Sequence, residues 1–299
     1  MIKSPRAVAN NITLMLNQVL GANRFDRGPV NVEQLALEYT RSISPDSYIE
    51  RVEGYDLAGF EGALVPGETL PRRWGIMFDK KQNPGRRAYT IGHELGHFML
   101  HRHLVDDEPD FNGGFHCSKE AVELGLGRDI EKEANAFAAN LLMPFDDFRR
   151  TIPSDELADL QRISDAATRY GVSLTAAALR WLDYTNTRAI LISSNDGFAK
   201  WAKPSAAALK SGRYIRTKAE TFEMPSQSLA VSDIQPEEAL AGVRQHAGVW
   251  FPEPVVEMCM KTDKYGFELT LLHFEGRAPA YQAEDDELGD TYTRFFEAN

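Results

Sequence analysis

The sequence predicts an α+β fold, with a helix-rich N-terminal part that carries a small sheet and a strand-rich α+β region at the C-terminus. Up to about residue 187, apolar residues recur mainly at helical spacing. In this part, only residues 55–82 have the pattern of strands and turns. From about residue 188 the pattern changes to strand, turn and strand. We therefore place a domain boundary near residue 187.

Two helices are predicted at the N-terminus. Residues 5–21 carry apolar positions at helical spacing and end at Gly21, a suitable C-cap. A second helix follows Pro29 in PVNVEQLALEYT. Strands are then expected in YDLAGFEGALV and in WGIMFD, residues 74–79.

Asn83 and Pro84 predict the start of a longer helix, because asparagine is a good N-cap and proline suits the first turn. This helix runs through RRAYTIGHELGHFMLH. Residues 104–128 are acidic and Gly-rich, and we predict a loop or insertion there. Another helix covers DIEKEANAFAANLLM and stops at Pro144.

Residues 155–184 contain two more predicted helices, with YGVS as the turn between them. The segment ISDAATRYGVSLTAAALRWL resembles a helix-turn-helix. Nearby acids match its three arginines, whereas DNA binding would need basic residues on the second helix. We therefore favour a structural or partner-binding role. The C-terminal region is expected to form hairpins in RAILISSNDGFAKWAK and in VVEMCMKTDKYGFELTLLHFE.

The bulk composition is that of a globular protein. A chain of 299 residues is long enough for two domains, and 43% hydrophobic with 26% charged residues is ordinary for such domains. No apolar run approaches the roughly 20 residues that span a bilayer. The N-terminus lacks the pattern of a signal peptide. These features predict a cytoplasmic protein.

Charge and cysteine content exclude some further classes. The net charge of -11 argues against direct nucleic-acid binding by the whole chain, because such binding needs a basic face. Cys117 and Cys259 are far apart in sequence and match no paired-cysteine spacing. We therefore expect two unpaired thiols, with no disulfide and no cysteine-based zinc site.

Five of the seven histidines fall within residues 93–116, and His93, Glu94 and His97 form an HExxH motif. On a helix, positions i and i+4 lie on one face, so both imidazoles can reach one Zn²⁺ at about 2.0–2.1 Å. Glu94 is rotated around the helix and can take a proton from a zinc-activated water that attacks a carbonyl. The motif is typical of metallopeptidases.

A catalytic zinc usually has three protein ligands and one open position. His103 stands at the place of the last histidine in HExxHxxGxxH, but Leu100 replaces the glycine that turns the chain. His101 is one turn beyond His97, where it would give poor tetrahedral geometry. We interpret both as residues behind the ligands or at the surface.

Glu131 is the better candidate for the third ligand. It shares a helix face with Asn135, and the small residues Ala134 and Ala138 lie on nearly the same face. Small residues would let this helix approach the glycines at 92 and 96 closely, and Asn135 would orient a histidine ligand. The rival carboxylate, Glu133, is turned away from that face.

RRAYTIGHELGHFMLH followed by EKEANAFAANLLMP resembles the ImmA/IrrE family of zinc metallopeptidases. The resemblance covers roughly residues 30–185. Together with the change of pattern near residue 187, it predicts a zincin-like metallopeptidase domain at 1–152, a helical, helix-turn-helix-like segment at 153–187 and a strand-rich α+β domain at 188–299. Some members of the family carry a GAF-like C-terminal domain, so a GAF-like sensor is one interpretation of the last region.

The resemblance also implies one Zn²⁺ per chain, with His93, His97 and Glu131 as metal ligands and Glu94 as the catalytic residue. Members of the family are endopeptidases that cleave DNA-binding repressors, often of helix-turn-helix type, in stress or mobile-element responses. The function expected from it is an intracellular zinc endopeptidase with a repressor as its protein substrate. The alternative is a non-catalytic zinc-containing regulator that binds a repressor or partner protein through the same fold.

Two further hypotheses concern single segments. The WGIMFD segment is either an edge strand beside the cleft, where a peptide substrate would pair with it, or an interior strand. Cys117 and His116 lie in the segment predicted as an insertion, and an inhibitory approach of either one to the metal is disfavoured against an unligated position.

Overall fold

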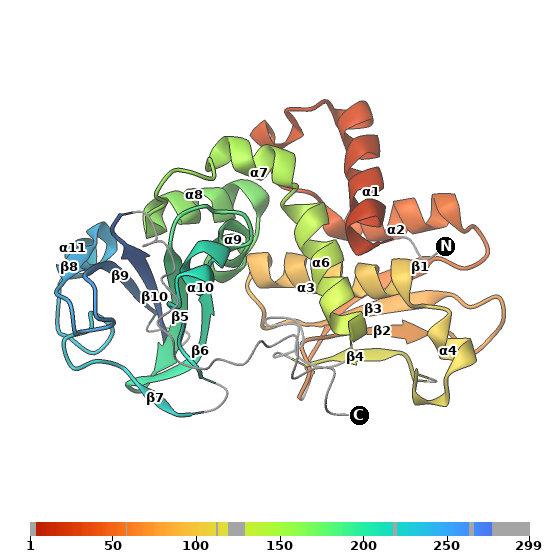
Figure 1. Ribbon diagram of the computed structural model, residues 1–299. Helices are drawn as coiled ribbons and strands as arrows, with labels where there is room; N and C mark the ends of the chain where they lie inside the picture. Colours follow the sequence, from red (N-terminus) through yellow and green to blue (C-terminus); the bar gives the residue numbers. More distant parts are fainter. Residues whose placement is uncertain are drawn as a thin grey trace, which may run out of the picture. The chain divides into compact units, whose positions relative to one another are not determined.

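The computed structural model describes residues 4–57, 59–111, 113–118, 129–217, 220–262 and 266–276. The chain divides into two compact units, Met1–Tyr184 and Thr185–Asn299 (Figure 1). Helices and two sheets confirm the mixed α+β class. The helical segment at 153–187 falls almost wholly within the first unit, and the three-part division of the chain stays a prediction.

The first unit combines helices with one small sheet. Five of its described helices begin after a residue whose side chain caps them, namely Ser4, Asn31, Asn83, Asp159 and Ser173. Asn83 accepts a hydrogen bond of 2.9 Å from the backbone N–H of Arg86, directly before Pro84. The described helices of this unit are α1 (Pro5–Leu20), α2 (Val32–Ile43), α3 (Pro84–Leu100), α4 (Leu104–Asp107), α6 (Asp129–Leu142), α7 (Phe145–Thr151), α8 (Leu160–Tyr170) and α9 (Leu174–Leu182).

The sheet of the first unit has the order β1-β3-β2-β4. Strands β1 and β3 are parallel, and the other pairs are antiparallel. The strands are β1 (Ile49–Tyr55), β2 (Gly62–Pro66), β3 (Trp74–Asp79) and β4 (Phe115–Cys117). Helix α3 packs on β2 and β3.

Two strand predictions need correction. WGIMFD forms β3, which pairs on both sides, so the edge-strand alternative is wrong and the interior one holds. Strand β1 begins at Ile49, before the predicted strand region. The prediction missed this start because most residues of β1 are exposed and the segment shows no clear apolar alternation.

The segment at 104–128 is not simply a loop. Within its described residues it forms α4, a 3-10 turn (Pro109–Phe111) and the edge strand β4. Residues 119–128 lie outside the described part of the chain. The prediction failed because three residues are too few to show a strand period.

The three arginines of the helix-turn-helix-like segment make contacts within the first unit. Arg162 pairs with Glu156, and Arg169 pairs with Asp26 and Asp147. Arg180 is buried and donates to the carbonyl of Met143. These contacts favour the structural role expected for this segment.

The second unit contains a six-stranded antiparallel sheet in the order β7-β6-β5-β10-β9-β8. The turn between β5 and β6 is Asp196-Gly197, and both residues have positive φ, of 50° and 81°. This is the two-residue hairpin turn predicted from the Asn/Asp-Gly pattern. The elements are β5 (Ala189–Asn195), β6 (Phe198–Pro204), α10 (Ala206–Lys210), β7 (Phe222–Glu223), α11 (Pro236–Ala241), β8 (Val243–Gln245), β9 (Val255–Thr262) and β10 (Phe267–Phe274).

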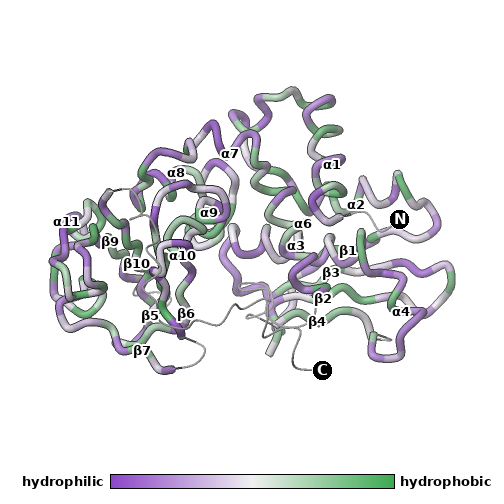
Figure 2. Tube along the Cα trace, in the orientation of Figure 1, coloured by the Kyte–Doolittle hydropathy of each residue, from purple (hydrophilic) through white to green (hydrophobic). Residues whose placement is uncertain are grey.

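No helix among the described residues is both long and apolar enough to cross a membrane. Hydrophobic and hydrophilic residues are interspersed along the chain in both units (Figure 2).

Candidate metal centre

Helix α3 supplies the first two donors of the centre. His93 and His97 lie one turn apart and are both fully buried. Their Nε2 atoms are 3.0 Å apart. Two imidazoles at this distance point their unsubstituted nitrogens at the same small space, which is the arrangement expected of a pair of metal ligands.

Helix α6 brings Glu131 to the same point. Its Oε2 lies 3.2 Å from the Nε2 of His93, and its Oε1 lies 3.5 Å from the Nε2 of His97. The helices come this close because glycine faces alanine between them. A Cβ added to Gly96 would lie 3.1 Å from the Cα of Ala134. The structure therefore brings the three expected ligands together.

The other nitrogen of each histidine is occupied from behind. The Nδ1 of His93 lies 3.0 Å from the Oδ1 of Asn135, the residue expected to orient a histidine. The Nδ1 of His97 lies 3.1 Å from the Nδ1 of His101, whose Nε2 lies 2.9 Å from the Oε2 of Glu133. Such partners fix the ring orientation and leave the Nε2 atoms for a metal.

Two of the three residues weighed as rivals to Glu131 thus stand behind His97. His101 and Glu133 form a chain of contacts that ends on its ring. His103 lies at the start of α4 and is not one of the grouped donors.

Glu94 is fully buried beside the histidines. Among the described residues, neither of its carboxylate oxygens has a hydrogen-bond partner of good geometry, although the Cys117 thiol lies close enough to lower its pKa. Burial dominates and raises the pKa of Glu94 to about 7. Gly62 leaves room for the Glu94 carboxylate, because a Cβ at residue 62 would lie only 2.8 Å from Oε1 of Glu94. An unpartnered buried carboxylate indicates a missing polar or cationic neighbour.

Burial and mutual contact also set the charges of the donors. Burial lowers the pKa of His97 to about 3, so that its ring is neutral, as a metal ligand requires. Burial also acts to lower the pKa of His93, but Glu131 and Glu94 outweigh it and raise the pKa overall. Burial acts to raise the pKa of Glu131, but its contacts with both histidines hold the pKa well below its ordinary value.

Cys117 is the member of the centre that sequence reasoning set aside. Its thiol is fully buried, and its Sγ lies 3.4 Å from the Nε2 of His97. Both cysteines are free, as expected. The geometry nevertheless places Cys117 with His93, His97 and Glu131, with all four donor atoms within 4.8 Å of one another. The only sequence signal was an apolar-polar-apolar triplet, Phe-His-Cys, inside an acidic segment.

The donor set fits zinc. Ligand atoms bound tetrahedrally to one zinc lie roughly 3.3–3.6 Å apart, given bonds of about 2.0–2.3 Å. Four donor contacts here measure 3.0, 3.2, 3.4 and 3.5 Å, with Glu131 presenting a different oxygen to each histidine. All four donor atoms lie within 4.8 Å of one another. Nitrogen, carboxylate and sulfur donors together are typical of zinc rather than of magnesium or calcium.

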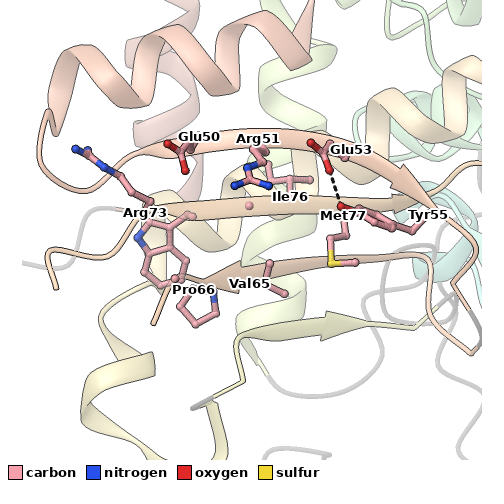
Figure 3. Close-up of a pocket in the computed structure, with 12 residues that line it drawn as sticks. Glu50, Arg51, Glu53, Tyr55, Val65, Pro66, Arg73, Ile76 and Met77 are labelled. Atoms are coloured by element: carbon pink, nitrogen blue, oxygen red, sulfur yellow. Dashed lines mark hydrogen bonds between the residues drawn. The ribbon is translucent and has the colours of Figure 1, made fainter. Parts of the chain in front are cut away.

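A separate cavity of about 220 Å³ lies along β1, β2 and β3 (Figure 3). Glu53 and Tyr55 line it, and the Tyr55 hydroxyl donates to the Glu53 carboxylate. None of the grouped donors lines this cavity. The candidate chemistry therefore belongs to the space between α3, α6 and β4.

An α+β unit in which an HExxH helix meets a carboxylate from a second helix has the arrangement of a metallopeptidase domain. Residues 52–182 match the family model of the IrrE N-terminal-like domain, Peptidase_M78. This match contains the whole candidate centre and confirms the resemblance to the ImmA/IrrE family over these residues.

A solved structure of similar fold is a Mycobacterium tuberculosis transcriptional regulator. Its TM-score is 0.51, its sequence identity is 16%, and the match covers 90% of this chain and 76% of the other. At that identity the likeness concerns the fold alone. A search of curated proteins found no significant match.

Proposed function

We propose that this chain is a zinc-dependent endopeptidase with one Zn²⁺ per chain, in which His93, His97 and Glu131 hold the metal and Glu94 is the general base. The observation that carries the proposal is the buried carboxylate of Glu94 beside the converging donors, which has no hydrogen-bond partner of good geometry among the described residues. A merely structural metal site has no use for a carboxylate that costs free energy to bury.

Zinc, when bound, supplies a Lewis acid that polarises a carbonyl and lowers the pKa of water. Glu94 takes the proton of the attacking water and delivers it to the leaving amine. Burial acts to raise the pKa of Glu94, which favours a carboxyl group that can both accept and return a proton near neutral pH. Asn135 and His101 keep the two imidazoles oriented throughout.

The resemblance to the ImmA/IrrE family supports a proposal for the substrate class. We propose a DNA-binding repressor, often of helix-turn-helix type, as the protein substrate, in a stress or mobile-element response in the cytoplasm. The zincin-like domain at 1–152, the helix-turn-helix-like segment at 153–187 and a GAF-like sensor at 188–299 belong to the same proposal. The support for a sensor role is the strand-rich α+β content of the second unit.

The test is co-expression with candidate repressors, comparing wild type with Glu94→Gln and Glu131→Gln by intact mass and metal content. We expect wild type to cleave one repressor at one bond. Glu94→Gln should retain zinc and lose cleavage by about 100-fold or more. Glu131→Gln should lose stoichiometric zinc, because a ligand is removed. Cleavage by Glu94→Gln at the wild-type rate would show that the mechanism is wrong.

A second function, a non-catalytic zinc-containing regulator, is favoured by one observation. Cys117 adds a fourth donor, and closed four-ligand sites are typical of structural zinc. In that case wild type and Glu94→Gln would bind the same repressor equally well and leave it intact.

A further inference from the structure

We propose that Cys117 is a fourth protein ligand of the same metal, which fills the position that a catalytic centre keeps open and holds the peptidase latent. This inference rests on the proposed function. It concerns the state in which the enzyme is at rest, and it assigns a role to the thiol that the HExxH mechanism leaves unused.

The position of the thiol supports coordination. Cys117 Sγ lies 3.4 Å from the Nε2 of His97, close to the roughly 3.6 Å expected between sulfur and nitrogen ligands of one tetrahedral zinc. The thiol is fully buried among the donors of His93, His97 and Glu131. Its partners are therefore those of a metal ligand rather than those of an inert core cysteine.

The strand β4 selects Cys117 rather than His116. Side chains alternate along a strand, and Phe115 and Cys117 are buried whereas His116 is exposed. The Phe115 ring stacks on the His97 ring, with centroids 4.7 Å apart. The backbone N–H of Glu61 donates to the carbonyl of Cys117 at 2.9 Å and holds the strand end in place. His116 instead contacts the ring of Phe60, away from the donors.

Glu94 shows what a fourth protein ligand would block. It is fully buried beside the grouped donors, so the water that it must activate has to be bound at the metal itself. A thiolate in the fourth position leaves no coordination site for that water. The base is thus in place while its reaction partner is excluded.

The charge of the ligand set also supports a latent centre. The thiol binds as a thiolate and releases its proton to solvent when the metal enters. With the Glu131 carboxylate and the Cys117 thiolate bound, a dication carries no net charge, so it polarises water and carbonyls less strongly. The same thiolate binds zinc tightly, which favours retention of the metal in the latent state.

Release of the thiol would involve one strand pairing. Among the described residues, β4 lies at the sheet edge and pairs with β2, through Gly62, Ala63 and Leu64. Opening of the fourth position would therefore require β4 to separate from β2 and Phe115 to leave the ring of His97.

The test uses the full chain loaded with Co²⁺ in place of zinc. A cobalt–thiolate bond gives an intense sulfur-to-metal charge-transfer absorption that nitrogen and oxygen ligands do not give. We expect this absorption in wild type and in Cys259→Ala, which removes the other buried cysteine in the second unit. Cys117→Ala and Cys117→Ser should bind cobalt without the absorption, and retained cobalt shows that the site has folded.

Two further measurements accompany the spectrum. Chelator competition should show zinc held about tenfold or more weakly in Cys117→Ala than in Cys259→Ala. Cleavage of the repressor should be faster in Cys117→Ala than in wild type, because the fourth position is open.

The outcomes separate this inference from the proposed function. Stoichiometric cobalt without the absorption in wild type overturns the role of Cys117, even if Glu94-dependent cleavage is found. If wild type shows the absorption but neither wild type nor Cys117→Ala cleaves any repressor, Cys117 remains a metal ligand. Both the latent state and the proposed peptidase function are then wrong. The absorption with faster cleavage by Cys117→Ala supports both.

Discussion

At the residue scale, burial gives the titratable side chains of the first unit their roles. Glu94, His97 and Asp147 are all buried, but their partners differ. Among the described residues, Glu94 has no hydrogen-bond partner of good geometry, and burial raises its pKa, whereas Asp147 accepts hydrogen bonds from several donors. The raised pKa of Glu94 suits proton transfer, whereas the hydrogen-bonded carboxylate of Asp147 stabilises the fold.

Asp147 gives a prediction on acid stability. Its side chain is 8% exposed and accepts from Tyr170, Arg169 and Arg150 at 2.7, 3.2 and 3.0 Å. Burial acts to raise the pKa of Asp147, but these donors outweigh it and lower the pKa below 3.8. A carboxylate with a lowered folded-state pKa contributes stability above its unfolded pKa and loses it as pH falls through the folded pKa.

We therefore expect Asp147→Asn to destabilise the first unit by about 2–3 kcal/mol at pH 7, since hydrogen bonds to a charged group are lost. The difference from wild type should shrink as pH falls below about 4. Urea unfolding at several pH values measures both. The exposed Asp146→Asn on the same helix should differ little from wild type, and a pH-independent deficit in Asp147→Asn would contradict the assignment.

At the element scale, the contact between α3 and α6 decides whether a metal centre exists. Gly92 and Gly96 of α3 face Ala138 and Ala134 of α6. The spacing of small residues along both helices predicted this close contact. The contact matters because a carboxylate on α6 reaches the histidines only if the helices nearly touch. The presence of β4 beside them was not predicted.

The two glycines offer a matched pair. A Cβ on Gly92 would meet side-chain atoms of Leu142 and Ala138 at 3.4 and 3.5 Å, which is ordinary contact. A Cβ on Gly96 would meet the backbone of Ala134 at 3.1 Å, which side-chain movement cannot relieve. Each alanine also gains up to about 1 kcal/mol in helix propensity.

Gly96→Ala should accordingly push α6 outward, withdraw Glu131 from the histidines and weaken zinc binding by about tenfold or more. Gly92→Ala should keep wild-type affinity and equal or exceed wild-type stability. Chelator competition and thermal unfolding of both variants distinguish the two effects. Equal zinc affinities would show that helix spacing does not position the ligand.

At the scale of the whole molecule, the chain separates into a unit that holds the entire donor set and a unit with its own core. The core of the second unit includes Ile190, Ile192, Val255, Leu272 and Phe274. Its buried carboxylate, Glu257, accepts from Ser228, Gln245, Trp250 and the backbone of Leu229. Such a satisfied core indicates independent folding.

Residues 1–184 expressed alone should therefore fold and bind one zinc with the affinity of the full chain. The full chain should show two unfolding transitions, of which the shorter chain retains one. Calorimetry with metal analysis tests this. Loss of zinc binding in the shorter chain would show that the second unit is needed to form the centre.

The sequence by itself determined what depends on local spacing. The HExxH pair, the capped start of α3, the small-residue face of α6 and the Asp-Gly hairpin follow from helix and strand periods within a few residues. Only the tertiary structure decided that β3 is interior and that Cys117 joins the donors. Both depend on which distant strands pair, and β4 is too short to show a period of its own.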